Sequence, residues 1–331
     1  MKKTITISGM TCENCESYIR KKIESLPDVK KVIVSLENNN AILFFQKVKT
    51  QLPITLSQYF YLFILAAPLF YISPIKAQMQ ELGNPLTYSV AWKQTAAEHR
   101  ALFHQGFNIA TMRVQQAIAE RTGNESEKPL AVITDIDETV LLANAYWGYL
   151  IDSNQDFFDD TSWDQWVAYN EFSPSPGSTA FLKFCENNDV EVFYVTNRNQ
   201  GEETFQLALN NLRAAQLPFA QAANLRVLRS TSNKEEVQTT IREEFEVIAL
   251  LGDNLNDFSR KYYSTDVDER AQLMSEDSAR FGNEYILFPN PTDGHWIRAI
   301  FGQSEPAPND ANRRILRDAA SKERWNPNTG N

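Results

Sequence analysis

The chain has 331 residues, of which 43% are hydrophobic and 22% are charged, a composition that allows one large folded domain or two smaller ones. Its formal net charge of −10 at pH 7 argues against nonspecific binding to a nucleic-acid polymer, which requires Lys and Arg to neutralise phosphates. A small anionic substrate is compatible with this charge, because it needs only a local positive site. The three cysteines, Cys12, Cys15 and Cys185, are too few to staple a small secreted fold.

Residues 1–46 are predicted to form a separate βαββ unit. Strands are expected over residues 4–7, 32–34 and 41–45, where apolar and β-branched residues cluster. A helix between the first two strands has apolar residues at helical spacing and is closed by Pro27, because proline cannot continue a helix.

The loop that opens this helix has the sequence GMTCENC, with Cys12 and Cys15. In this context it resembles the heavy-metal-associated domain of copper chaperones and metal-transporting ATPases. In that family the two thiolates bind one soft ion such as copper(I), in agreement with the preference of soft metals for sulfur. That family folds as βαββαβ, whereas only βαββ precedes the apolar stretch here. Two interpretations therefore stand: a soft-metal site at Cys12 and Cys15, or a partial domain whose cysteines bind nothing.

Residues 52–77 are predicted to be a signal sequence or a transmembrane anchor. Residues 54–72 are nineteen consecutive residues without a charge, about the length that crosses a bilayer. Lys47 and Lys49 precede this run, so the positive-inside rule keeps the N-terminal unit in the cytoplasm and exports the rest. A buried core helix is opposed by the absence of a polar helical face.

Ala77 follows two prolines of the same segment, Pro68 and Pro74, which resembles the end of a cleavable signal sequence. Cleavage and retention as an anchor both stay open. Both predict an extracytoplasmic location for the residues after this segment, whether periplasmic, secreted or membrane-anchored.

Residues 78–128 are predicted to form a helical arm, because apolar residues recur at helical spacing until Thr-Gly-Asn at 122–124. His99 and His104 lie in this arm and His295 in a later loop. The two arm histidines are expected to pack or to face solvent rather than to bind a metal.

Residues 129–303 alternate between strand and helix patterns. Buried strands are predicted over residues 130–134, 190–195, 225–228, 247–251 and 285–288. This alternation predicts an α/β, Rossmann-like fold with a parallel sheet and helices on both faces. Residues 304–331 are a polar tail, helical only over 312–322.

Polar residues follow the predicted strands at or shortly after their carboxyl ends, where ligands bind in such sheets. They are Asp135, Asp137, Thr196, Asn197, Arg198, Lys234, Asp253 and Asp257. Two carboxylates two residues apart at a strand end suit a nucleophile, a metal ligand and an acid/base in one site.

DIDET, Thr196, Lys234 and GDNLND, in this order, are similar to the four signatures of the haloacid dehalogenase (HAD) superfamily. The resemblance extends to class C acid phosphatases, the bacterial lipoprotein-type 5'-nucleotidases, and spans about residues 88–300. It rests on the segments DIDETVLLANAYWGYL, WDQWV, FYVTNR, GDNLNDF and FPNPTDGHW, together with Pro176-Gly177 and Ser232-Asn233-Lys234.

The resemblance implies that Asp135 is the nucleophile and that Asp137 protonates the leaving oxygen and then activates water. It implies magnesium held by Asp135, the Asp137 main-chain carbonyl and Asp253, with Asp257 close by. Thr196 and Lys234 would hold the phosphoryl group. The other residues expected to contact substrate are Asn197, Arg198, Trp163 and Tyr146, although Trp163 and Tyr146 are equally expected as core of a helical cap.

The implied activity is that of an exported, magnesium-dependent acid phosphatase acting on a small phosphomonoester, with 5'-nucleotides as a candidate class. Two departures bear on this. Gln78 stands where family members carry a lipid-attachment cysteine, and Thr292-Asp293 stands where a tyrosine often stacks on the base. A phosphotransferase of the same superfamily and a soft-metal-binding protein using Cys12 and Cys15 are the alternatives, and the sequence indicates no oligomeric state.

Overall fold

A computed structural model describes residues 2–6, 29–35, 40–45, 83–123 and 127–325. The chain divides into two compact units, residues 1–76 and residues 77–331. Each unit is considered by itself.

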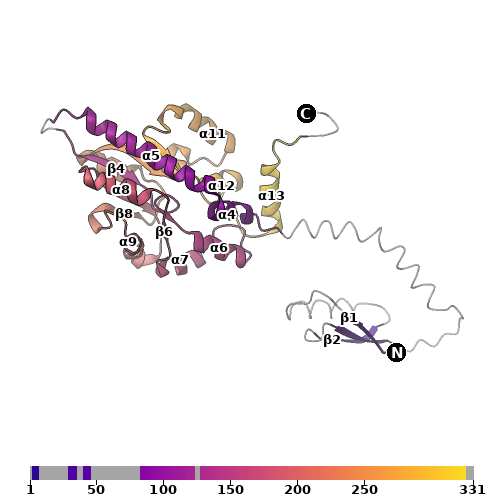
Figure 1. Ribbon diagram of the computed structural model, residues 1–331. Coiled ribbons are helices and arrows are strands. Elements are labelled where there is room, and N and C mark those ends of the chain that lie inside the picture. Colours follow the sequence, from indigo (N-terminus) through magenta and orange to yellow (C-terminus); the bar gives the residue numbers. More distant parts are fainter. Residues whose placement is uncertain (1, 7–28, 36–39, 46–82, 124–126, 326–331) are drawn as a thin grey trace, which may run out of the picture. The chain divides into compact units, whose positions relative to one another are not determined.

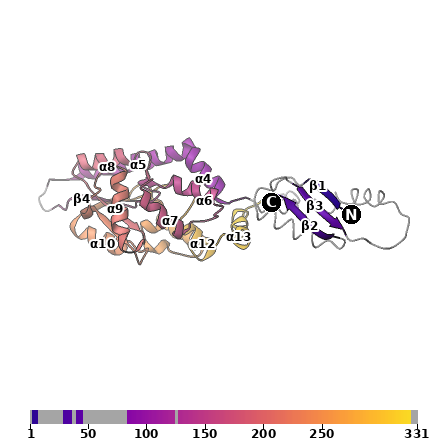
Figure 2. The ribbon, with the colours of Figure 1, turned by 90° about the horizontal axis from the view of Figure 1, so that it is seen from below.

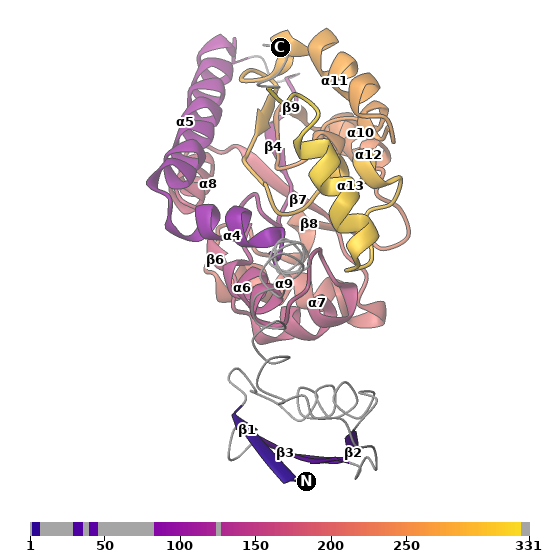
Figure 3. The ribbon, with the colours of Figure 1, turned by 90° about the vertical axis from the view of Figure 1, so that its right-hand side faces the viewer.

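The first unit contains a three-stranded antiparallel sheet with the order β1-β3-β2 (Figure 3). Its strands are β1 (Lys2–Thr6), β2 (Val29–Ser35) and β3 (Asn40–Phe45). Alternate residues of β2, Val32 and Val34, are buried, as expected for a sheet with one covered face.

Two sequence predictions lie outside the described residues: the soft-metal site at Cys12 and Cys15, and the apolar segment 52–77. Across the helices that the structure describes, none combines the length and the apolar character that a membrane span requires.

The second unit is built on a five-stranded parallel sheet with the order β10-β9-β4-β7-β8. The strands are β4 (Leu130–Thr134), β7 (Glu191–Asn197), β8 (Leu225–Leu228), β9 (Glu246–Gly252) and β10 (Tyr285–Leu287). All five residues of the central strand β4 are buried, as its unbroken apolar run predicts. The predicted α/β fold with a parallel sheet is confirmed.

Helices cover both faces of this sheet (Figure 2). The core on one side includes residues of α5 (Ala97–Glu120), α8 (Ser178–Asn187) and α9 (Thr204–Ala214), and the core on the other includes residues of α10 (Glu235–Glu244) and α11 (Val267–Glu276). Helix α12 (His295–Phe301) packs against α11. Successive residues of β4 point to opposite faces, so Val132 belongs to the first core while Ala131 and Ile133 belong to the second.

The predicted helical arm is two helices, α4 (Leu86–Thr95) and α5, because Ala96 between them is extended. His99 of α5 is buried between the rings of Trp92 and Phe103, each at 5.0 Å, and is a packing residue. The C-terminal helix α13 covers Asp310–Ala320, close to the predicted 312–322.

A small cap follows β4 in the chain. It consists of α6 (Asn144–Asp152), α7 (Asp160–Trp166) and a ribbon of β5 (Leu141–Leu142) with β6 (Ser173–Pro174). Its core is aromatic and contains Tyr146, Trp147, Phe158, Trp163, Trp166 and Phe172. In Figure 1 the cap helices α6 and α7 lie together beside β6, and the cap begins at Leu141, shortly after β4 ends at Thr134.

Candidate active site

The loops at the carboxyl ends of β4, β7 and β9 surround a pocket of about 180 Å³. Predicted site residues that line it are Asp135, Asp137, Thr196, Asn197, Lys234, Asp253 and Asp257. Parallel strands bring their carboxyl ends to one sheet edge, which explains why residues far apart in the sequence meet here. The predicted phosphoryl-binding and carboxylate residues therefore share one pocket.

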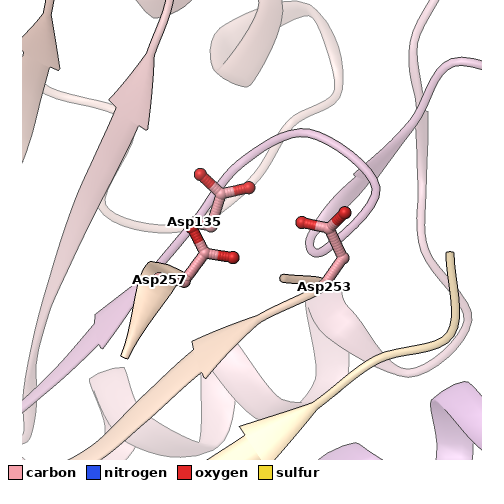
Figure 4. Close-up of side chains that lie close together, drawn as sticks. All are labelled: Asp135, Asp253 and Asp257. Carbon is pink, nitrogen blue, oxygen red and sulfur yellow. The ribbon is translucent and has the colours of Figure 1, made fainter. Parts of the chain in front are cut away.

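Three carboxylates form the centre of this pocket (Figure 4). One oxygen each from Asp135, Asp253 and Asp257 lies within 4.8 Å of the other two. The backbone N–H of Asp135 donates to the Leu251 carbonyl at 2.9 Å, which ties the β4 loop to β9. A Cβ on Gly252 would overlap the Asp257 side chain, so a glycine is required for Asp257 to fold back over the strand end.

The negative charge of this cluster is only partly compensated. Burial raises the pKa of Asp135, Lys234 lowers it, and Asp257 and Asp137 add to the rise, so that the pKa of Asp135 is about 7. Burial and the charges of Asp257 and Asp135 likewise hold the pKa of Asp253 well above its ordinary value. Carboxylate oxygens are the ligands that hard divalent cations prefer. The three residues therefore fit such an ion, which would relieve their mutual repulsion.

Lys234 supplies the local positive charge. Its Nζ lies 2.5 Å from Asp135 Oδ1 and 2.8 Å from Asp257 Oδ1. Burial works against its charge, but Asp135 and Asp257 outweigh burial and raise the pKa of Lys234. A buried, charged ammonium beside the Asp135 carboxylate is suited to stabilise negative charge that develops there.

Arg198, which we expected to contact substrate, is the hydrogen-bond partner of Asp137 and also lines a cavity of about 400 Å³ next to the pocket. Its Nε donates to Asp137 Oδ2 at 2.7 Å and its Nη2 to Oδ1 at 2.5 Å. Its Nη1 donates to Asn211 Oδ1 at 2.7 Å. These hydrogen bonds use one N–H of each guanidinium nitrogen and hold Asp137 in place, and further N–H groups of Arg198 stay available for the substrate contact that the sequence predicts. The Thr196 hydroxyl reaches the same carboxylate at 3.4 Å.

A second cavity of about 400 Å³ adjoins the first and shares Asn197, Ser232 and Asp293 with it. Trp163 lines this cavity. Tyr146 lines neither cavity: its side chain is buried, its ring lies 5.0 Å from Trp163, and its hydroxyl exchanges hydrogen bonds with the Asp159 backbone. Tyr146 is therefore part of the core of the cap, because its ring packs against Trp163 and its hydroxyl is hydrogen-bonded to the backbone.

Sequence reasoning missed Asn290. Its Nδ2 donates to Asp253 Oδ2 at 2.7 Å, which orients one carboxylate of the cluster. The only signal was the FPNP segment, and an Asn beside a proline is first interpreted as a turn residue.

Two further pocket residues were also missed. Asp293 lines both cavities, and burial raises its pKa to about 6. His295 lines the smaller one, and burial together with Arg270, Arg298 and Arg260 lowers its pKa to about 4. Both lie in the FPNPTDGHW segment that the sequence analysis names, but no local pattern indicates their pKa values, which depend on the charges that surround them in the fold.

Comparison with known proteins identifies the family. Residues 65–296 match the HAD superfamily, subfamily IIIB (acid phosphatase), and residues 4–43 match the heavy-metal-associated domain. Two crystal structures of a class C acid phosphatase from Bacillus anthracis, one with tungstate bound, are similar to this chain at 28% sequence identity and a TM-score of 0.65. Each alignment covers 72% of this chain and 97% of the other. The family match covers the parallel sheet and the carboxylate pocket at the edge of that sheet. The chain therefore belongs to the acid phosphatases of HAD subfamily IIIB, and it is a phosphomonoesterase.

Proposed function

We propose that this enzyme hydrolyses small phosphomonoesters in two steps, through a phosphorylated Asp135 and with Mg²⁺ bound by Asp135, Asp253 and Asp257. The observation that carries the proposal is the contact of Lys234 with Asp135 inside a cluster of three carboxylates. The Asp137 main-chain carbonyl is a further ligand in this proposal. The ion, when bound, would neutralise charge on the transferring phosphoryl group.

In the first step an Asp135 oxygen attacks phosphorus and the bond from phosphorus to the leaving oxygen breaks. Asp137 gives that oxygen a proton. In the second step Asp137 takes a proton from water, the water oxygen attacks phosphorus, and the bond to Asp135 breaks to release phosphate. Splitting one displacement into two lowers each barrier, and the same side chain serves as acid and then as base.

The remaining pocket residues would stabilise and orient the reacting groups. Lys234 would pair with one phosphoryl oxygen, and the Thr196 hydroxyl and the Asn197 amide would donate to others, a preorganised arrangement of the kind that contributes most to such catalysis. Arg198 would keep Asp137 aimed at the leaving oxygen. Asp137 Oδ2 accepts from Arg198 and from Thr196, whereas Oδ1 accepts from Arg198 and keeps a second lone pair that can carry the proton for the leaving oxygen.

The leaving group would enter the 400 Å³ cavity. Trp163 and Phe158 offer it apolar surface, and Asn199 and Gln200 offer amide groups. Such a mixture suits a planar, polar leaving group, so we propose 5'-nucleotides as one substrate class. This chain has Thr292-Asp293 where family members often have a tyrosine. Without that tyrosine, Trp163 would be the aromatic residue that stacks on a nucleotide base, which would weaken the preference for nucleotides.

We also propose that the catalytic unit acts outside the cytoplasm. The support is in the sequence: Lys47 and Lys49 precede nineteen uncharged residues, which favours export of the residues that come after them. Residues 52–77 would then either be removed as a signal or keep the enzyme at the membrane.

The test is phosphate release from a panel of phosphomonoesters, with Mg²⁺ and after its removal by a chelator. The panel should include nucleotides, sugar phosphates and aryl phosphates, and the assay should cover acidic to neutral pH. Mass spectrometry of acid-quenched enzyme should detect a phosphate on the peptide that contains Asp135. Turnover that is unchanged after chelation, or a phosphate on another residue, would contradict the proposal.

A further inference from the structure

Helix α4, which lies outside the sheet, contributes a buried lysine, Lys93. The Nζ of Lys93 lies 2.6 Å from Glu138 Oε2 and 2.8 Å from Thr292 Oγ1. It also lies 4.9 Å from the centre of the Trp147 ring. The residue is only 3% exposed, and lysines are almost never buried this deeply without a partner. Its two partners belong to two different loops of the candidate site.

The first partner, Glu138, belongs to the loop that carries Asp135 and Asp137. Its backbone φ is +56°, a region that residues other than glycine rarely adopt. Its Oε1 accepts hydrogen bonds from Trp147 Nε1 at 2.8 Å and from the Ala143 N–H at 3.2 Å. The ion pair with Lys93 therefore completes a set of contacts that keeps this loop in an unfavourable conformation.

Thr139, the next residue in this loop, reaches the cluster. Its hydroxyl lies 3.5 Å from Asp253 Oδ1. The position of the loop that carries Glu138 and Thr139 therefore determines whether Asp253 Oδ1 has this hydrogen-bond partner.

The second partner, Thr292, belongs to the loop after β10. Its hydroxyl accepts from Lys93 and donates to Asn290 Oδ1 at 2.7 Å, and its backbone N–H donates to the same oxygen at 3.0 Å. Asn290 in turn donates to Asp253 Oδ2 at 2.7 Å. A chain of three hydrogen bonds thus runs from Lys93 to the other oxygen of Asp253.

We infer that Lys93 is a positioning residue: it holds the two loops that orient Asp253 toward Asp135 and Asp257, and so sets the affinity of the cluster for a divalent cation. This inference rests on the metal site of the proposed function. The physical reason is that a ligand already fixed at both oxygens loses little freedom when a cation binds. Removing an outer partner of a metal ligand typically lowers metal affinity about 10- to 100-fold.

Two variants test this inference. Thr292→Val keeps the shape of the side chain, the Lys93–Glu138 pair and the backbone hydrogen bond to Asn290, but removes the hydroxyl that connects Lys93 to Asn290. The double variant Lys93→Met/Glu138→Gln removes both charges together, so that no unpaired charge remains buried. Gln94→Ala is the matched control, because Gln94 is the exposed neighbour of Lys93 on the same helix.

The readout is Mg²⁺ binding by calorimetry and Mn²⁺ binding by electron paramagnetic resonance, with circular dichroism to verify folding. We expect the dissociation constant to rise about 10- to 100-fold in both test variants and to stay unchanged in Gln94→Ala. Saturating Mg²⁺ should restore most of the turnover of Thr292→Val, which a purely structural defect would not allow.

Folded test variants that bind both cations as tightly as the wild type would overturn the role of Lys93 and leave the metal site intact. Wild-type enzyme that binds neither cation would instead overturn the metal site and this inference with it.

Discussion

Arg198 holds Asp137 through two parallel hydrogen bonds, Nε to Oδ2 at 2.7 Å and Nη2 to Oδ1 at 2.5 Å. The guanidinium is itself fixed, because it also donates to Asn211 and lies 5.0 Å from the centre of the Phe172 ring. Bidentate pairs of this kind fix direction as well as distance. Arg198, which holds the proposed acid/base Asp137, is thus fixed by Phe172 of the cap and by Asn211 of α9. A change in the packing of the cap would therefore affect proton transfer by Asp137.

Asp135→Asn should abolish turnover while the fold stays intact. An amide cannot attack phosphorus, so we expect phosphate release to fall by about three orders of magnitude or more. Circular dichroism should match the wild type. Asp268→Asn is the matched control, since the exposed Asp268 forms only a surface ion pair with Lys322. Wild-type phosphate release by Asp135→Asn would show that another residue is the nucleophile.

Asp137→Asn should lower the rate of hydrolysis most for substrates whose leaving oxygen is most basic, because such an oxygen must be protonated to leave. Alkyl phosphates should lose about 100-fold or more in kcat/KM, which reports the first step, because no acid protonates the alkoxide. The comparison uses kcat/KM because kcat also includes the second step, in which Asp137 is the base for every substrate. p-Nitrophenyl phosphate should lose much less, since p-nitrophenolate leaves without a proton. An equal loss on both substrates would contradict the assignment of Asp137 as the acid.

Arg198→Lys should reproduce this pattern more weakly, by about 10-fold on alkyl phosphates, because a lysine cannot form the bidentate pair. Arg229→Lys is the control, because Arg229 lines the same larger cavity but is 44% exposed and does not contact Asp137. If Arg198→Lys raised KM alone, Arg198 would be a substrate contact after all.

The metal-free enzyme should lose stability as pH rises from acidic to neutral. Folding raises the pKa of Asp135 from 3.8 to about 7 and that of Glu305 from 4.5 to about 7. A carboxyl with a raised folded-state pKa stabilises the fold below its unfolded pKa, and this contribution disappears as pH rises through the folded value. Between about pH 4 and pH 7 the melting temperature of chelated enzyme should therefore fall.

Mg²⁺ should reverse this trend, raising the melting temperature most at the upper end of the range, where the carboxylates are ionised. Asp253→Asn should flatten the dependence, because it removes another carboxyl whose pKa is raised by burial. A metal-free melting temperature that rises over the same range would contradict the raised pKa values.

Replacing Cys12 and Cys15 by serine should leave phosphate release unchanged within about twofold, because thiolates prefer soft ions and the carboxylate cluster prefers hard ones. Phosphate release by the double variant, measured with and without copper, checks this. A large loss in the double variant, or a response of the wild type to copper that the double variant lacks, would mean that the N-terminal unit regulates the enzyme.

Much of the fold and of the catalytic loop can be predicted from the sequence itself. The apolar run at 130–134 predicts the central strand, and that strand spans Leu130–Thr134. Strand patterns and the residues directly after them are local properties, because burial on both faces of a sheet imposes an unbroken apolar run. The parallel arrangement then predicts that Asp135, Lys234 and Asp253 share one pocket, as they do.

Only the tertiary structure decided which partner each polar side chain has. Arg198 contacts Asp137 at the edge of the larger cavity, Tyr146 is buried in the cap, and Lys93 reaches Thr292 across 199 residues of sequence. Hydrogen-bond partners of this kind depend on how helices and loops pack against one another, and local periodicity carries no information about that packing. For this enzyme the sequence alone therefore determines the residue types at the strand ends, while packing of the arm and the cap decides how those residues are held.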